Sequence, residues 1–213
     1  MDNERATRRR RANGEQSRRA ILDAAAEVAG ERGYDGTSIA LVSAACGLPA
    51  SSIYWHFKDK DELIAAVIES GFQRWLAALD LSDAHLDPAV DTAVELSARV
   101  ARALLDTPDF LRLGLMLTLE RRPQQPSART MFLRVRDRFT EVLLTTLRQW
   151  APHLDDEQVG LLATYTMAGA DGLFIAKEIG GDSVDLVRLF DLHARVVFDA
   201  ATRLMTQPGK AQP

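Results

Sequence analysis

The stretch that decides the fold covers residues 37–63 and reads TSIALVSAACGLPASSIYWHFKDKDEL. It begins with two good N-cap residues, Thr37 and Ser38, followed by apolar residues at helical spacing. Gly47 stands where a helix favours a left-handed residue at its C-terminal end, and Pro49 suits the start of a second helix. The spacing therefore predicts two short helices joined by a tight turn, which is a helix-turn-helix motif.

The second of these helices has one apolar and one outward face. Ile53 and Phe57 share one side, whereas Ser51 and Trp55 fall nearly opposite Ile53 at ~100° per residue. Exposed large aromatic side chains typically mark a binding surface, and Trp55 is suited to contact a thymine methyl group. Because the second helix of such a motif enters the DNA major groove, we expect this face to contact DNA. The alternative is an ordinary helical hairpin with Tyr54 and Trp55 in its core.

Residues 17–68 resemble the N-terminal domain of the TetR (tetracycline repressor) family of bacterial transcription regulators. The order, spacing and residue types agree in RAILDAA (19–25), GY (33–34), TSI (37–39), ACGL (45–48), IYWHF (53–57) and KDKDEL (58–63). The match covers about a quarter of the chain, and the remainder is similar to the family only in length, helicity and layout. The resemblance implies an all-α fold, with an N-terminal three-helix DNA-binding domain and a C-terminal helical domain for ligand binding and dimerisation.

The resemblance also assigns DNA contacts. Tyr54 and His56 fall on positions that contact phosphate oxygens, to which a phenol and an imidazole can donate. Ser52 falls on a small hydroxyl position that reaches the DNA backbone, and Lys60 on a phosphate-contacting lysine. Ala50 departs from the pattern, because a basic or polar residue usually stands at this position. The departure puts direct base readout from the start of the second motif helix in doubt. The full expected DNA-contacting set is Thr37, Ser38, Ala50, Ser51, Ser52, Tyr54, Trp55, His56, Lys60, Arg10 and Arg11.

Residues 1–16 form a basic arm with five arginines and no apolar run. We expect this arm to be disordered alone and ready to follow phosphates or enter a minor groove. Residues 1–60 hold ten Lys and Arg against eight Asp and Glu, although the whole chain has a net charge of −4. The pattern indicates a basic DNA-binding end on an acidic body. The alternative is a solubilising tail; a signal peptide is excluded because no hydrophobic segment follows.

The composition favours a cytoplasmic protein. A length of 213 residues with 46% hydrophobic content allows a substantial core in one or two domains. A single cysteine excludes an intramolecular disulfide, and no apolar run approaches the ~20 residues that span a membrane. We find no His or Cys pair at metal-ligand spacing, no phosphate-binding glycine loop and no nucleophile elbow. We therefore expect no metal, no cofactor and no enzymatic activity.

The rest of the chain predicts further helices and no strand. Periodicity and Pro or Gly breaks predict helices over residues 17–32, 60–79, 87–107, 110–119, 127–150, 155–179 and 183–206. The expected domain organisation is a disordered basic arm (1–16), a DNA-binding domain (17–62), a ligand-binding and dimerisation domain (63–206) and a disordered tail (207–213).

The last two helices are expected to form a homodimer interface. Glycine inside a helix costs ~0.5–1 kcal/mol relative to alanine, so close helix packing is a reasonable cause of Gly169 and Gly172. The final helix is apolar on more than one side and needs additional burial. In the TetR family these helices pair across the dimer, which implies binding to an inverted-repeat operator of double-stranded DNA. The expected interface residues are Ala163, Gly169, Gly172, Leu189, Val196 and Val197; the alternative is that the small residues serve packing within one chain.

The middle helices are expected to enclose a pocket for a small-molecule effector that is apolar or aromatic. The residues expected to line it are Trp75, Phe110, Met116, Phe132, Phe139, Tyr165 and Thr166. Three functions stay open at this point. The chain is a ligand-released homodimeric repressor, an effector-independent regulator or activator of the same fold, or a helical ligand-binding protein with a non-functional DNA motif.

Overall fold

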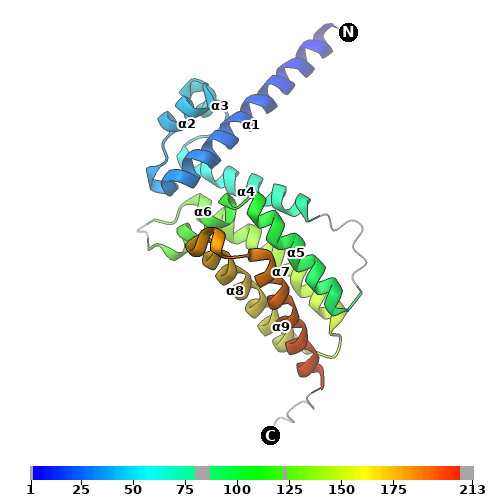
Figure 1. Ribbon diagram of the computed structural model, residues 1–213. Coiled ribbons are helices and arrows are strands. Elements are labelled where there is room, and N and C mark those ends of the chain that lie inside the picture. Colours follow the sequence, from blue (N-terminus) through cyan, green and yellow to red (C-terminus); the bar gives the residue numbers. More distant parts are fainter. Residues whose placement is uncertain (1, 80–86, 122–123, 207–213) are drawn as a thin grey trace. The chain divides into compact units, whose positions relative to one another are not determined.

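The computed structural model describes residues 2–79, 87–121 and 124–206, with residues 2–11 described as backbone only. The described residues form helices and no strand, so the predicted all-α fold is confirmed (Figure 1). The predicted disordered tail, residues 207–213, lies outside the described residues. The elements in chain order are α1 (Asp2–Gly36), α2 (Ile39–Cys46), α3 (Ala50–His56), α4 (Lys60–Ala78), α5 (Val90–Asp106), α6 (Asp109–Leu119), α7 (Ser127–Trp150), α8 (Asp156–Gly180), the short 3-10 turn η2 (Gly181–Ser183) and α9 (Leu186–Thr206).

The first helix is longer than the sequence pattern indicated. The arm over residues 1–16 was expected to be disordered, but α1 begins at Asp2. Residues 2–16 contain no proline, one glycine and many good helix formers, so propensity favours extending the helix through them. The helical path breaks at Gly33, whose φ of 68° suits glycine, and the Thr37 hydroxyl donates to the Gly33 carbonyl over 2.7 Å. This break turns the chain into α2.

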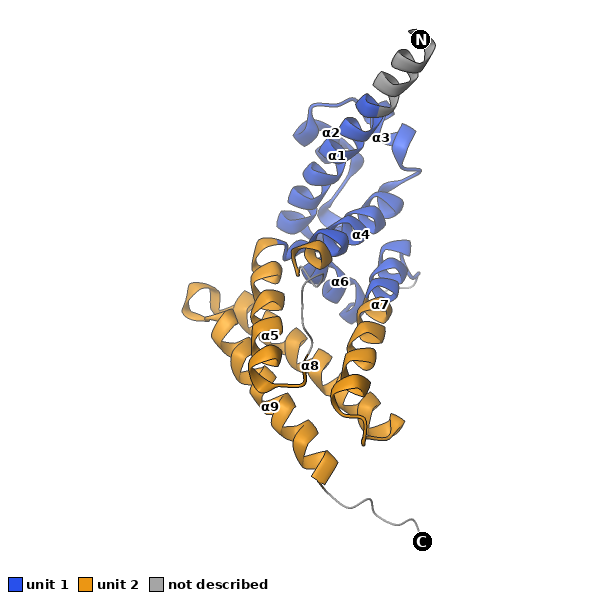
Figure 2. Ribbon diagram, turned by 90° about the vertical axis from the view of Figure 1, so that its right-hand side faces the viewer, with its two compact units in different colours: residues 1–74, 107–135 blue, residues 75–106, 136–213 orange. Residues whose placement is uncertain are grey.

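The chain divides into two compact units, coloured separately in Figure 2. Unit 1 comprises residues 1–74 and 107–135, and unit 2 comprises residues 75–106 and 136–213. The units therefore do not follow the expected division at residues 62 and 63, because most of α4, all of α6 and the start of α7 belong with the N-terminal helices. Helices α4 and α7 each begin in unit 1 and end in unit 2.

Each unit has its own apolar core. In unit 1, the core joins α1 to the motif helices and α4 through fully buried Ile21, Val42, Ile53, Leu63, Ile64 and Ile68. In unit 2, a cluster joins α7, α8 and α9 through Leu147, Val159, Leu162, Ala163 and Val197. Arg136 on α7 also donates two hydrogen bonds to Asp171 on α8, over 2.8 and 2.7 Å. This paired geometry fixes α7 against α8.

Gly114 allows α6 and α7 to approach closely within unit 1. A Cβ atom built on Gly114 would overlap the ring of Phe132, which is almost completely buried. We expect Gly114→Ala to lower the free energy of unfolding by ~1–3 kcal/mol, because the ring has no space into which to move. Chemical denaturation followed by circular dichroism measures this difference.

Gly160→Ala is the matched control, because nothing lies within 4 Å of the added methyl group on α8. This control should stabilise the helix by up to ~1 kcal/mol. Equal stability of the two variants would show that the contact between Gly114 and Phe132 does not limit packing.

Candidate nucleic-acid interface and ligand cavity

The turn between α2 and α3 is fixed by local bonds. The Ser38 side chain caps α2 by accepting a hydrogen bond from the Leu41 N–H, and Gly47 ends the helix with a φ of 67°. The Ser43 hydroxyl then donates to the Leu48 carbonyl over 2.6 Å. Pro49 precedes α3 in an extended conformation. These bonds confirm the predicted helix-turn-helix geometry and set the direction of α3.

Helix α3 turns its aromatic side chains outward. Ile53 is fully buried and Phe57, which follows the helix, is 3% exposed, so these two hold the helix to unit 1. Tyr54 is 56% exposed and Trp55 is 77% exposed. The alternative in which both residues belong to a hairpin core is therefore wrong. Among the other expected contact residues, Ser51 is exposed, while Ala50, Ser52 and His56 are half-buried on the flanks.

The exposed face of α3 adjoins α1. A Cβ atom at Gly14 would lie 3.8 Å from the Trp55 ring, so the N-terminal part of α1 runs beside this side chain. Trp55 also packs edge-on against His56, with ring centroids 4.5 Å apart. Residues from two helices therefore contribute to one surface.

His56 is held in an environment that favours its neutral form. Burial, followed by the positive charge of Arg18, lowers the pKa of His56 below its ordinary value of 6.5, although Glu15 acts in the opposite direction. Arg18 itself lies over the Phe57 ring, 5.4 Å from its centroid. A neutral imidazole still has one N–H to donate, so His56 can contact a phosphate oxygen without carrying a charge.

Two residues of the expected DNA-contacting set also make hydrogen bonds within the chain. Thr37 is 2% exposed and donates its hydroxyl to Gly33, so it shapes the end of α1 and is removed from the outer surface. Lys60 donates from Nζ to the Tyr34 carbonyl over 3.0 Å, and the same nitrogen lies 4.5 Å from the centroid of the Tyr34 ring. The side chains of Arg10 and Arg11 lie outside the described residues.

Asp61 joins three segments at the edge of the motif. Its carboxylate accepts hydrogen bonds from the backbone N–H groups of Ser127 (2.6 Å) and Ala128 (3.1 Å) and from the Tyr34 hydroxyl (3.2 Å). Burial raises the pKa of Asp61, but these hydrogen bonds outweigh burial and hold the pKa below its ordinary 3.8. The residue therefore caps the N-terminus of α7 from the first turn of α4. Sequence reasoning missed this role because the partners are separated by 66 and 67 residues.

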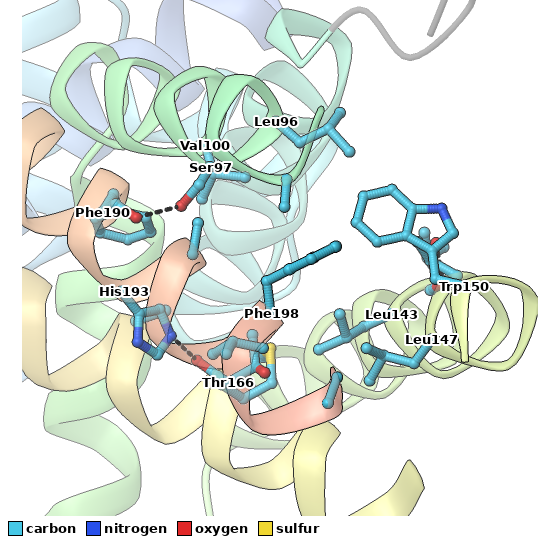
Figure 3. Close-up of a pocket in the computed structure, with 18 of the residues that line it drawn as sticks. Leu96, Ser97, Val100, Leu143, Leu147, Trp150, Thr166, Phe190, His193 and Phe198 are labelled. Carbon is cyan, nitrogen blue, oxygen red and sulfur yellow. Dashed lines mark hydrogen bonds between the residues drawn. The ribbon is translucent and has the colours of Figure 1, made fainter. Parts of the chain in front are cut away.

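Unit 2 contains a cavity of about 290 Å³ (Figure 3). Residues of α5, α7, α8 and α9 line it, together with Leu79, Pro88 and Ala151. Apolar side chains dominate the lining, including Leu96, Val100, Leu143, Leu147, Trp150 and Phe198. A concave, mostly apolar site with a few polar groups is typical of a small-molecule site.

Most residues expected to line a pocket lie elsewhere. Only Phe139 and Thr166 belong to the lining. Trp75 packs edge-on against Phe139, with ring centroids 4.9 Å apart, and Tyr165 is 52% exposed. The other three, Phe110, Met116 and Phe132, belong to unit 1. Aromatic type alone therefore did not separate cavity residues from core residues.

The residues expected at a dimer interface divide into two groups. Ala163 and Val197 are buried in the core of unit 2, and a Cβ at Gly169 would overlap the His193 ring, so these three serve packing within the chain. Leu189 is half-buried, whereas Gly172 and Val196 are exposed.

An exposed apolar stripe runs along α8. Its members are spaced alternately four and three residues apart, which places them on one helical face. Sequence reasoning missed most of them because it selected residues by small size instead of helical phase. The stripe consists of Leu161, Tyr165, Ala168, Gly172, Ile175 and Ile179, and exposed Leu192 and Val196 lie on α9.

By length and composition alone, the segment Asp156–Ser183 is apolar enough to cross a membrane, with mean hydropathy of 1.4 over an 18-residue window. The segment is not an uninterrupted apolar run, because Asp171 and Lys177 lie within it. A core helix of a soluble protein passes the same test, so the finding is weak support for a membrane segment. Only 22% of the window is buried within the chain, which agrees with the exposed stripe.

Among the described residues, no group of three or more His, Cys, Asp or Glu is placed to hold a metal ion.

Comparisons with known proteins agree with the motif. Residues 21–67 match the family model described as bacterial regulatory proteins, tetR family. An HTH-type transcriptional repressor of Mycobacterium tuberculosis is 28% identical over 182 residues, which cover 82% of this chain and 89% of the relative. The HTH-type transcriptional regulator AcrR of Shigella flexneri is 34% identical over 62 residues, and the match covers only 29% of each chain.

A solved structure shares the fold over most of its length. The regulator FadR from Bacillus subtilis, determined in complex with stearoyl-CoA, superimposes with a TM-score of 0.70. The match covers 85% of this chain and 97% of FadR, at 17% sequence identity.

The Asp61 cap gives a test of how unit 1 is held together. We expect Asp61→Asn to lower the free energy of unfolding by ~0.5–2 kcal/mol near neutral pH, because a neutral amide caps a helix less well than a carboxylate. Since folding lowers the pKa of Asp61, its contribution is present above 3.8 and is lost as the pH falls further. Urea unfolding at several pH values measures the difference.

The exposed Asp137 of α7 supplies the control variant, Asp137→Asn, which makes the same chemical change away from the cap. Its effect should be near zero throughout. A gap between wild type and Asp61→Asn that stays constant below pH 3.8 would contradict the cap.

Proposed function

We propose that this chain, a member of the TetR family of bacterial regulatory proteins, is a homodimeric repressor that binds an inverted-repeat operator and is released by a small apolar effector. Its relatives are transcriptional regulators, including a repressor matched over most of both chains. The single observation that carries the proposal is the exposure of Tyr54 and Trp55 on a helix held by Ile53. A repressor of this kind acts in the cytoplasm, where the DNA is.

DNA recognition is assigned to α3. Seven residues are too few for a helix that is stable alone, so α3 depends on unit 1 and presents one face only. That face carries hydroxyl, phenol, indole and imidazole groups, which can meet phosphates and base edges. The exposed Ser38 side chain lies close in sequence at the start of α2. Thr37 is left out of the contact set because it is 2% exposed and its hydroxyl donates to the Gly33 carbonyl. Lys60 stays in the set, because its ammonium group has three hydrogens and donates one of them to the Tyr34 carbonyl.

Dimerisation is assigned to the apolar stripe on α8 with Leu192 and Val196 of α9. Exposed apolar area of this extent is costly in water and typically marks an association surface. A two-fold axis would bring the same stripe from each subunit together. It would also present two copies of α3 to half-sites roughly 34–36 Å apart.

Effector binding is assigned to the cavity of unit 2. A ligand can change DNA affinity only if it binds more tightly to one conformation than to another. The cavity is lined by α7 and by Leu79 directly after α4, and both helices begin in unit 1. These helices are therefore the natural route of the signal. The cavity also supports this function over that of an effector-independent regulator.

Substitutions on α3 test DNA recognition. We expect Trp55→Ala to weaken binding to the preferred sequence by ~1–3 kcal/mol and to relax preference at one base pair. Tyr54→Phe should weaken binding to all sequences alike, because a lost phosphate contact carries no sequence information. Selection from a random DNA pool, followed by affinity measurement at fixed salt, gives both results.

Leu119→Ala is the matched control, because Leu119 is 74% exposed in unit 1 but lies on α6. Binding by both α3 variants at the strength of wild type would show that this helix does not read DNA.

Charges placed in the stripe test dimerisation. The double variant Leu161→Asp with Ile175→Asp should be monomeric in analytical ultracentrifugation, because a dimer would bury four unpaired carboxylates. Leu119→Asp adds a charge at an equally exposed leucine outside the stripe and should leave the association state unchanged. A dimer that persists in the double variant would place the interface elsewhere.

A further inference from the structure

The cavity of unit 2 is lined by few ionisable groups. Among its lining residues there is no Asp or Glu, and the basic groups are Arg99 and His193. Arg99 is paired with Glu95 over 2.6 Å, one helical turn away on α5, and its side chain is 31% exposed. The guanidinium charge is therefore already balanced by a carboxylate, and water reaches part of the side chain.

The hydroxyl groups of the lining are also occupied. Ser97 donates to the Phe190 carbonyl over 2.9 Å, a bond visible in Figure 3. The threonine hydroxyls each donate to the carbonyl four residues earlier in their own helices, at 3.0 Å for Thr146, 2.7 Å for Thr166 and 2.9 Å for Thr202. Since each hydroxyl has only one hydrogen to donate, none of these groups can donate to a ligand without losing a bond.

His193 is held by the wall of the cavity itself. Its Nε2 lies 3.0 Å from the Thr166 carbonyl, which can only accept, so this nitrogen carries the hydrogen (Figure 3). Gly169 leaves the space for the ring, because a Cβ there would overlap it. This position was expected to serve a dimer interface, and its observed role is to admit the imidazole between α8 and α9.

From these bonds we infer that the cavity selects a ligand without formal charge, mainly hydrocarbon, and rejects carboxylates and ammonium groups of the same shape. The inference rests on the proposed effector role of the cavity. An ionised group that enters the cavity leaves water and finds no acidic side chain, an Arg99 already paired with Glu95, and a His193 whose Nε2 is already bonded to the Thr166 carbonyl, which is strongly unfavourable. A hydrocarbon chain or aromatic ring instead exchanges water for Leu96, Leu143 and Phe198, which is favourable.

A series of compounds that share a ten-carbon chain tests this selectivity on the full-length protein. 1-Decanol, decanoate and decyltrimethylammonium compete with the neutral dye 1-aminoanthracene, and displacement is followed by dye fluorescence at neutral pH. Decanol should displace the dye at concentrations at least ~10-fold lower than either charged compound, because each tenfold in affinity requires only ~1.4 kcal/mol.

Two lysine variants link the selectivity to the cavity. Thr146 lines the cavity and Thr145 beside it does not, and each hydroxyl donates to the carbonyl four residues earlier in α7. Thr146→Lys and Thr145→Lys therefore remove the same kind of bond and add the same charge. Only Thr146→Lys should improve decanoate binding relative to decanol, by ~10-fold or more, because a partly buried ammonium can pair with a carboxylate.

The outcomes separate this inference from the effector proposal. One outcome is that decanoate or decyltrimethylammonium binds as tightly as decanol, while Thr146→Lys changes the ratio of the charged compound's affinity to that of decanol. This outcome would overturn the selectivity and keep the cavity as a ligand site. An equal response of both lysine variants would overturn the assignment to this cavity. Failure of the dye and all three compounds to bind would overturn both the inference and the effector role.

Discussion

The hydrogen bonds of Asp61 join the start of α4 to the start of α7 and to Tyr34, and both the helix-turn-helix motif and the cavity adjoin these two helices. This carboxylate lies in the first turn of α4 and accepts from the first backbone N–H groups of α7 and from Tyr34. Helices α4 and α7 are the two that continue from unit 1 into unit 2. Residues of α7, and Leu79 directly after α4, line the cavity. The two helices that cross from unit 1 into unit 2 therefore both begin beside the same side chain.

Local features of the fold could be predicted from the sequence. The Ser38 cap, the left-handed Gly47 and the spacing of Ile53 and Phe57 define α2 and α3 with short-range interactions. The bounds of α7 agree with the predicted range because Pro126 and Pro152 lie just outside them. The basic arm was predicted less well, since helical propensity outweighed the tendency of a charged segment to stay disordered.

Features that depend on long-range packing could not be predicted in the same way. Phe110 packs near Phe72, and Phe132 packs against Gly114. Phe110 and Phe132 therefore belong to unit 1, although their residue types suit a cavity equally well. Similarly, Gly169 and Gly172 are alike in sequence, but one faces His193 and the other faces open space. Only the orientation of α8 on α9 distinguishes a glycine that admits a ring from one on an exposed face.

The closeness of Gly14 to Trp55 bears on how such a protein could acquire new target sites. Because a Cβ atom at position 14 would already lie in van der Waals contact with the indole, at 3.8 Å, a side chain longer than alanine introduced there would compete for space with the ring that α3 presents. Mutations in the N-terminal helix would then alter the orientation of Trp55 while the sequence of α3 stayed unchanged. Comparisons of recognition helices alone would overlook this source of divergence between related regulators.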